Sequence, residues 1–242
     1  MMKKVIGILL LSFIVSASNA QILKEVYKKV TGGGDKNSTN GLSTEEVVSG
    51  LKEALTLGAE KSASQLSNMD GFFKNAAIKI LLPDEAKKVV ETVSRVPGGQ
   101  KLVDDAILSM NRAAEDAAKS AAPIFVNAIK NMSFADAWNI LRGGDSAATK
   151  YLREQTTKPL TEAFKPVIEK SLEKVNATQH WNTVFSTYNK FSFKKINPDL
   201  SGYVTDKALE GIFYQLALEE QKIRKDPVAQ TSNLLKKVFG VN

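Results

Sequence analysis

Apolar residues recur at helical spacing along most of the chain. The first such segment runs from Ser43 to about Leu66 and begins with Ser-Thr-Glu-Glu. In this pattern the Ser43 side chain can accept the amide hydrogen of Glu46, and Glu46 can reach back, so a capped helix is predicted. A second helix is predicted from Pro83, because proline suits a first turn and two acidic residues follow it.

The remaining helices are divided by prolines, glycines and capping residues. One is expected over 101–131, where Pro123 kinks or splits it, and the next runs from Ser133, which is capped with Asp136, to Gly143. Another runs from Asp145 and Ser146 to about Val175, with Pro159 and Pro166 as interruptions. The last two cover 203–225 and the segment that ends at Phe239. No strand-like alternation and no repeat of fixed period is present. The predicted fold class is all-α, a single compact bundle of short and medium helices.

The first twenty residues have the three parts of a secretory signal peptide. Two lysines are followed by an apolar run from Val5 to Val15, and small residues occupy Ser18 and Ala20. The run is shorter than the roughly 20 residues that span a bilayer, so an uncleaved anchor is the less favoured alternative. We expect cleavage after Ala20 and a periplasmic or secreted protein, with residues 21–41 as an N-terminal segment and flexible linker and residues 42–240 as the helical domain.

Composition narrows the possible partners. The chain has no cysteine, which excludes disulfides and lipoprotein attachment. Loss of the signal peptide lowers the formal charge from +7 to +5. The 33 basic residues are scattered among 26 acidic ones, which indicates a mixed solvated surface and not a nucleic-acid site. Anionic envelope material is the other partner that a basic exported protein could bind, and no membrane span is predicted in the mature protein.

The clearest pattern lies in the predicted helix over 101–131. One face is continuously apolar and carries Val103, Ile107, Met110, Ala114, Ala117, Ala121 and Ile124. Asn111 and Glu115 lie on the flank of that face among alanines, which allow another helix or a ligand to approach. Arg112 and Asp116 on the opposite side are expected to form an ordinary surface pair.

A second carboxylate occupies an apolar stripe near the C-terminus. Glu220 has the spacing of Leu209, Phe213, Leu216 and Ile223, and Arg224 lies one turn further on. A buried carboxylate needs a cationic or hydrogen-bonding partner, because an unpaired buried charge is costly. Three interpretations of Asn111, Glu115, Glu220 and Arg224 stay open: a polar network that locks two helices together, which is favoured, a small-ligand pocket, or catalysis by Glu115 and Glu220 facing each other across a cleft.

Metal and nucleophilic chemistry have little support. Asn197, Asp199, Ser201 and Thr205 partly match a calcium loop, but Ala208 stands where a bidentate glutamate belongs. A weaker match begins at Asp35 and ends at Glu46. The single histidine, His180, is expected to be a surface or packing residue, and no nucleophile elbow is present. No cofactor is predicted.

Several short blocks together resemble a known family. They are Gly50-Leu51-Lys52-Glu53-Ala54-Leu55, Asp70-Gly71-Phe72, Ile78-Lys79-Ile80-Leu81-Leu82-Pro83, Met110-Asn111-Arg112-Ala113-Ala114-Glu115, Gly211-Ile212-Phe213, and Glu219-Glu220 followed by Ile223-Arg224-Lys225-Asp226-Pro227. With these blocks the chain is similar to the bacterial domain of unknown function 4197 family over roughly residues 42–240. The resemblance implies an exported helical protein of Gram-negative bacteria and assigns no activity.

The function predicted from the sequence is therefore broad. An exported helical protein without a catalytic constellation is expected to bind a small ligand or an envelope partner without being an enzyme. The alternatives are a carboxylate-based hydrolase acting on envelope polymers and a calcium-stabilised structural module. The sequence does not set the oligomeric state.

Overall fold

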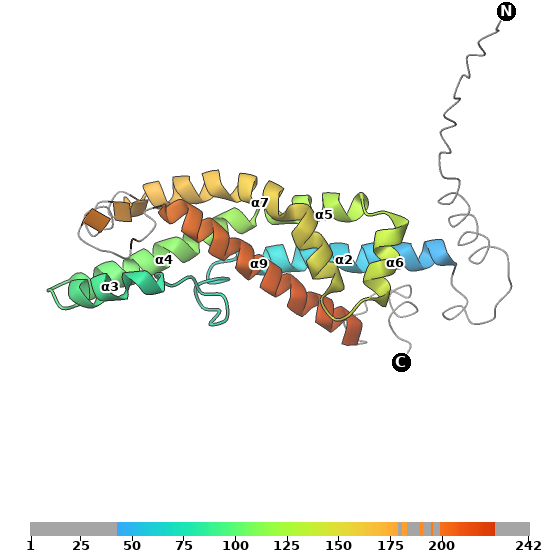
Figure 1. The fold of residues 1–242 in the computed structure, drawn as a ribbon, viewed down its shortest axis with the longest axis horizontal. Coiled ribbons are helices and arrows are strands. Elements are labelled where there is room, and N and C mark those ends of the chain that lie inside the picture. The colour runs from blue at the N-terminus through green and yellow to red at the C-terminus, as the bar shows by residue number, and fades with distance from the viewer. Residues whose placement is uncertain (1–42, 179–180, 183–188, 191–194, 196–198, 226–242) are drawn as a thin grey trace, which may run out of the picture. The chain divides into compact units, whose positions relative to one another are not determined.

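The computed structural model describes residues 43–178, 181–182, 189–190, 195 and 199–225 (Figure 1). The predicted signal peptide, the linker, the helix ending at Phe239, and the residues His180 and Asn197 lie outside these ranges. All the described residues belong to one compact unit, Thr39–Asn242.

Most of the described residues are helical, with no strand among them, so the all-α prediction is confirmed. The elements are α2 (Thr44–Ser67), a 3₁₀ turn η2 (Asp84–Ala86), α3 (Lys87–Ser94), α4 (Gly99–Ala118), α5 (Ala121–Lys130), α6 (Phe134–Arg142), α7 (Ala147–Glu173) and α9 (Leu200–Lys225). Within the described ranges, no helix combines the length and apolar character needed to cross a bilayer.

Local sequence explains several helix boundaries. The predicted capping box of α2 is present: Glu46 N donates to Ser43 Oγ at 3.2 Å, and Ser43 N donates to the Glu46 carboxylate at 2.7 Å. Ser133 caps α6 in the same way. The long helix predicted over 101–131 is split between α4 and α5, and Pro123 lies in the first turn of α5, where its missing N–H removes no helical bond.

The expectation that prolines interrupt α7 was wrong, whereas its predicted start at Asp145 and Ser146 is confirmed. The helix continues through Pro159 and Pro166 without interruption. Ser146 precedes its first residue, yet the Ser146 side chain makes no capping hydrogen bond. Burial stabilises the continuous helix, because Leu160, Phe164 and Ile168 lie fully buried along one side of it. The cap of α7 comes from another part of the chain, as described below.

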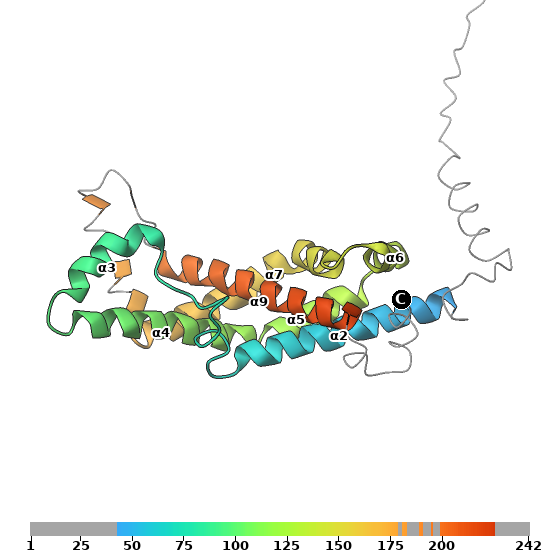
Figure 2. The same ribbon diagram turned by 90° about the horizontal axis from the view of Figure 1, so that it is seen from below.

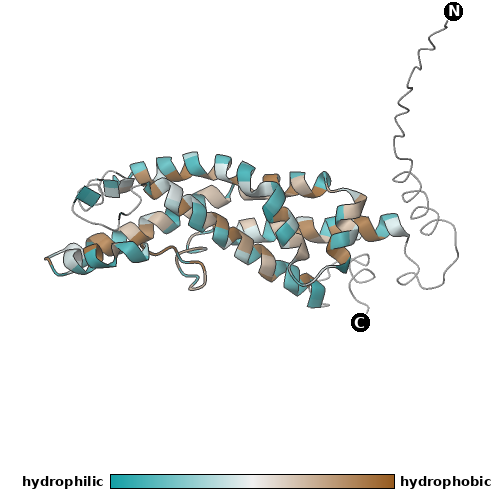
Figure 3. Cartoon of the chain, in the orientation of Figure 1, coloured by the Kyte–Doolittle hydropathy of each residue, from teal (hydrophilic) through white to brown (hydrophobic). Residues whose placement is uncertain are grey.

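The core forms where α7 packs along α4 and α9, and where α2 packs against α9 and α5 (Figures 1 and 2). Hydropathy alternates around each helix, as expected for amphipathic helices with one buried side (Figure 3). The rings of Phe125 on α5 and Phe213 on α9 meet edge to face, with centroids 5.9 Å apart. The predicted apolar stripes of α4 and α9 both face this core.

Residues 68–83 connect α2 to η2 without a helix. Near the start of this segment, Asp70 has φ 70, in the left-handed region. Phe72 is fully buried and packs on the backbone of α9 at Gly211, where a Cβ atom would lie 2.5 Å from the Phe72 ring. The absence of a side chain at Gly211 therefore lets this connecting segment enter the core.

Candidate functional site

Asn111 of α4 holds the connecting segment through its side-chain amide. Asn111 Oδ1 accepts from Ile80 N at 2.9 Å, while Asn111 Nδ2 donates to Ile80 O at 2.8 Å and to Ile107 O at 2.7 Å. The side chain is completely buried. Because the amide supplies both a donor and an acceptor, it satisfies both backbone groups of Ile80.

Glu115, one turn further along α4, holds the start of the same segment. Its Oε1 accepts from the amides of Phe72 at 3.1 Å and Phe73 at 3.2 Å. Arg112 donates to Glu115 Oε2 and to Asp70 Oδ1, both at 2.6 Å. Hydrogen bonds from Lys74 and then Arg112 lower the pKa of Asp70, and the bonds to Glu115 and Asp70 raise the pKa of Arg112. Arg112 therefore links two carboxylates.

The predicted surface pair of Arg112 with Asp116 was wrong. Asp116 pairs with Lys119 at 2.8 Å and accepts from Ser171 of α7 at 3.2 Å. The hydrogen bond from Lys119 lowers the pKa of Asp116 against the opposing effect of burial. Arg112 turns to the connecting segment because Glu115 and Asp70 together offer it two carboxylates.

Glu220 of α9 supplies the missing cap of α7. Its carboxylate accepts from Ala148 N at 3.0 Å, Thr149 N at 2.8 Å and Thr149 Oγ1 at 2.8 Å. These are amides of the first turn of α7, where a negative charge also interacts favourably with the helix dipole. Arg224 donates to Glu220 Oε1 at 3.0 Å and to Ile140 O, near the C-terminus of α6, at 2.9 Å.

The four candidate residues therefore form two separate sets. Asn111 and Glu115 bind the connecting segment, whereas Glu220 and Arg224 join α6, α7 and α9. Both carboxylates are nearly inaccessible, with 4% exposure for Glu115 and 5% for Glu220. A cavity of about 10 Å³ beside Glu220 has room for one water molecule at most. This geometry lacks the open cleft that a Glu115–Glu220 catalytic pair requires.

The described part of the calcium-loop candidate lies at the start of α9. Asp199 precedes α9 and accepts from Gly202 N at 2.8 Å and Ser201 Oγ at 2.8 Å. Thr205 Oγ1 donates back to Ser201 O within the helix at 2.7 Å. The Gly202 amide is the main cause of the lowered pKa of Asp199. Asp199 thus serves as the N-cap of α9.

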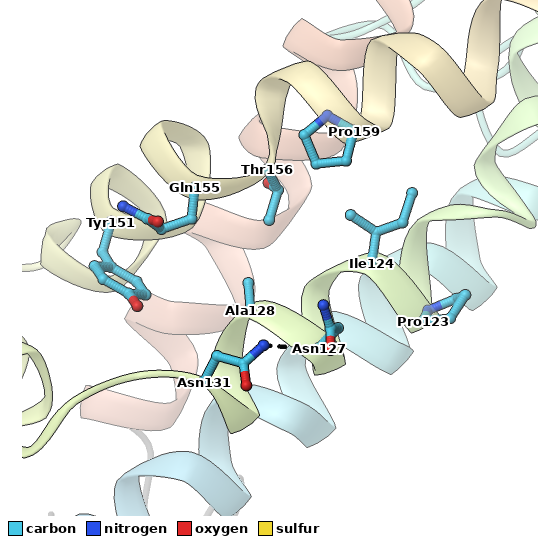
Figure 4. Close-up of a pocket in the computed structure, with 9 residues that line it drawn as sticks. All are labelled: Pro123, Ile124, Asn127, Ala128, Asn131, Tyr151, Gln155, Thr156 and Pro159. Atoms are coloured by element: carbon cyan, nitrogen blue, oxygen red, sulfur yellow. Dashed lines mark hydrogen bonds between the residues drawn. The ribbon is translucent and has the colours of Figure 1, made fainter.

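A groove between α5 and α7 was not predicted from the sequence (Figure 4). It has a volume of about 450 Å³, within the range of roughly 300–1,000 Å³ typical of small-molecule sites. Its lining consists of Pro123, Ile124, Asn127, Ala128 and Asn131 from α5 and Tyr151, Gln155, Thr156 and Pro159 from α7. None of these residues is charged, although 24% of the chain is Asp, Glu, Lys or Arg.

The polar groups of the groove are amides, a phenol and a helix carbonyl. Asn131 Nδ2 donates to Asn127 Oδ1 at a long 3.4 Å (Figure 4). Proline has no N–H, so Pro159 leaves the carbonyl oxygen of Gln155 without its α-helical donor. Burial raises the pKa of Tyr151, with a contribution from Asp136, which keeps the phenol protonated. The sequence features that could have indicated this groove are a proline within a helix and two asparagines four residues apart.

A second groove, of about 370 Å³, lies between the connecting segment and α9. Leu81, Tyr203, Lys207 and Tyr214 are among its lining residues, so this groove contains charge and exposed apolar surface. Tyr203 Oη donates to Leu81 O at 2.8 Å across one side of it.

Comparison with known proteins identifies the family. The model of a protein family of unknown function, DUF4197, matches residues 41–240. The chain belongs to this family. The family assignment covers every described residue and confirms the resemblance seen in the sequence blocks, three of which meet where Phe72 contacts Glu115 and Gly211. No curated protein and no solved structure matches the chain.

Proposed function

We propose that this member of the DUF4197 family is exported and acts as a non-enzymatic binding protein, with its ligand in the groove between α5 and α7. The groove carries the proposal because it combines adequate volume with apolar walls and a few polar groups. The buried carboxylates are bonded to the protein's own amides, so they have a structural role in this proposal.

The test uses native mass spectrometry of the processed protein, purified gently from the periplasm, beside its denatured mass. We expect an extra mass that is lost on denaturation. In an Ala128→Leu variant the larger side chain fills the groove floor while leucine keeps good helix propensity, so the extra mass should be absent. Asn139→Ala, an exposed change on α6, is the control and should retain the extra mass.

Two outcomes would contradict the proposal. Retention of the extra mass by Ala128→Leu would remove the groove as the site. A bare polypeptide mass for the wild type, together with no change in its melting temperature across a panel of uncharged metabolites, would remove ligand binding itself. The same denatured spectrum tests export, since a processed chain should begin at Gln21.

A further inference from the structure

We propose that the groove between α5 and α7 recognises an uncharged N-acetylated amino sugar, as a free saccharide or as a unit of a glycan. The inference rests on the proposed function and names the ligand class of the same groove. Its grounds are the absence of charge, the arrangement of the amides and the apolar contacts of the lining.

The absence of charged residues in the lining favours neutral ligands over anionic ones. A phosphate or carboxylate that lost water in the groove would need a cationic partner, and none of the lining residues supplies one. A free short peptide carries charges at both ends and faces the same cost. Saccharide hydroxyls are neutral and both donate and accept hydrogen bonds, which matches the carboxamide of Gln155 and the phenol of Tyr151.

The side chains of the two asparagines of α5 can hydrogen-bond to a secondary amide group of a ligand. They lie one helical turn apart, and their mutual bond at 3.4 Å uses Asn131 Nδ2 and Asn127 Oδ1. The Asn127 Nδ2 group and the Asn131 Oδ1 atom remain as a donor and an acceptor on the same face of the helix. An acetamido group presents the complementary pair of groups, a carbonyl oxygen and an N–H.

The apolar residues of the lining can contact the acetyl methyl group and the C–H groups of the sugar ring. Ile124 and Ala128 lie beside the asparagines and can contact the acetyl methyl group (Figure 4). The rings of Tyr151 and Pro159 lie on the α7 side, about 12 Å apart along the helix, so each can contact the C–H face of a different sugar unit of a disaccharide. The Gln155 carbonyl, which has no i+4 helical donor because residue 159 is proline, can accept a hydrogen bond from a sugar hydroxyl.

The test uses the full processed protein and the β-1,4-linked disaccharide of N-acetylglucosamine. Binding is followed through the side-chain amide signals of Asn127, Asn131 and Gln155 in ¹⁵N–¹H spectra. Cellobiose, which has the same linkage and no acetamido group, should bind at least about tenfold more weakly, because two hydrogen bonds are lost. Asn131→Ala should weaken the N-acetylated disaccharide by a similar factor, and Asn139→Ala should leave its affinity within about twofold.

Other results would overturn the inference. Equal binding of cellobiose would show that the acetamido group is not recognised. Tighter binding of a neutral blocked dipeptide would assign the asparagines to peptide recognition. If no saccharide binds while the native mass spectrum shows an extra mass that Ala128→Leu removes, the ligand class is wrong and the proposed function stands. If that extra mass is also missing, and no uncharged metabolite of the panel changes the melting temperature, both fail.

Discussion

Asn111 is a buried amide in an alanine-rich part of α4, and its three hydrogen bonds go to backbone groups. It acts as a peptide group would in a sheet, pairing with the N–H and the C=O of Ile80. An irregular segment inside a core needs such partners, because its own backbone groups lack the regular pairing of a helix.

Replacing Asn111 by alanine should lower the free energy of unfolding by about 2–6 kcal/mol. The cause is that Ile80 N and Ile80 O stay buried without partners, at about 1–3 kcal/mol for each group. Urea denaturation of both proteins measures the difference. Asn139→Ala is the matched control and should change stability by less than about 0.5 kcal/mol. A loss below about 1 kcal/mol for Asn111→Ala would contradict this account of the segment.

Asp199 gives a prediction about pH. Its pKa is lowered in the folded state, mainly by the Gly202 amide. The resulting stabilisation is complete above the unfolded pKa of about 3.9, and it is lost as pH falls through the lower folded pKa. Asp199→Asn keeps a good N-cap residue without the charge. The wild type should therefore exceed the variant in stability at pH 6, and this advantage should shrink progressively as the pH falls below about 4, as urea midpoints at each pH would show. An advantage that does not change with pH would refute the assignment.

At the scale of the helix, some helices are capped by residues next to them in the sequence, and others are capped by residues from distant parts of the chain. Ser43 and Ser133 cap their helices with residues three positions away, so these starts follow from local sequence. The start of α7 depends on Glu220, which is 72 residues from Ala148. A carboxylate from α9 therefore fixes where α7 begins, and no local pattern around Ser146 reveals it.

Gly→Ala substitutions at two glycines inside helices separate the effect of steric overpacking on stability from the effect of helix propensity. At Gly211 an added Cβ would lie 2.5 Å from the ring of Phe72, whereas at Gly58 the nearest atom is the flexible tip of Ile223 at 3.3 Å. Gly211→Ala should lower the free energy of unfolding by about 1–3 kcal/mol through overpacking. Gly58→Ala should leave stability unchanged or raise it by up to about 1 kcal/mol, because alanine is the better helix former. Thermal and urea unfolding would measure both, and a reversed order would contradict the packing described for Phe72.

For the molecule as a whole, the question is whether the buried polar residues act as one site or as two. Asn111 and Glu115 share the connecting segment, and Glu220 and Arg224 share the junction of α6, α7 and α9. The two sets have no hydrogen-bond partner in common among the described residues. Separate sets contribute independently to stability.

The double variant Asn111→Ala/Glu220→Gln should therefore lose the sum of the two single losses, within about 0.5 kcal/mol. The measurement is a double-mutant cycle from urea denaturation. The positive control is the Glu220→Gln/Arg224→Ala cycle, in which the residues are in direct contact and a coupling of about 0.5–3 kcal/mol is expected. A comparable coupling between Asn111 and Glu220 would restore the single network that the sequence suggested.

The sequence by itself determined the helical class, the two capping boxes, the break after α2, the split before Pro123 and the buried positions of Asn111, Glu115 and Glu220. Those features depend on neighbours within one or two turns, so periodicity and capping residues record them. Only the tertiary structure decided which partners the polar groups have, because Ile80, Phe72 and Ala148 come from distant parts of the chain. It also decided where the groove lies, since a groove between α5 and α7 exists only once the two helices are packed side by side.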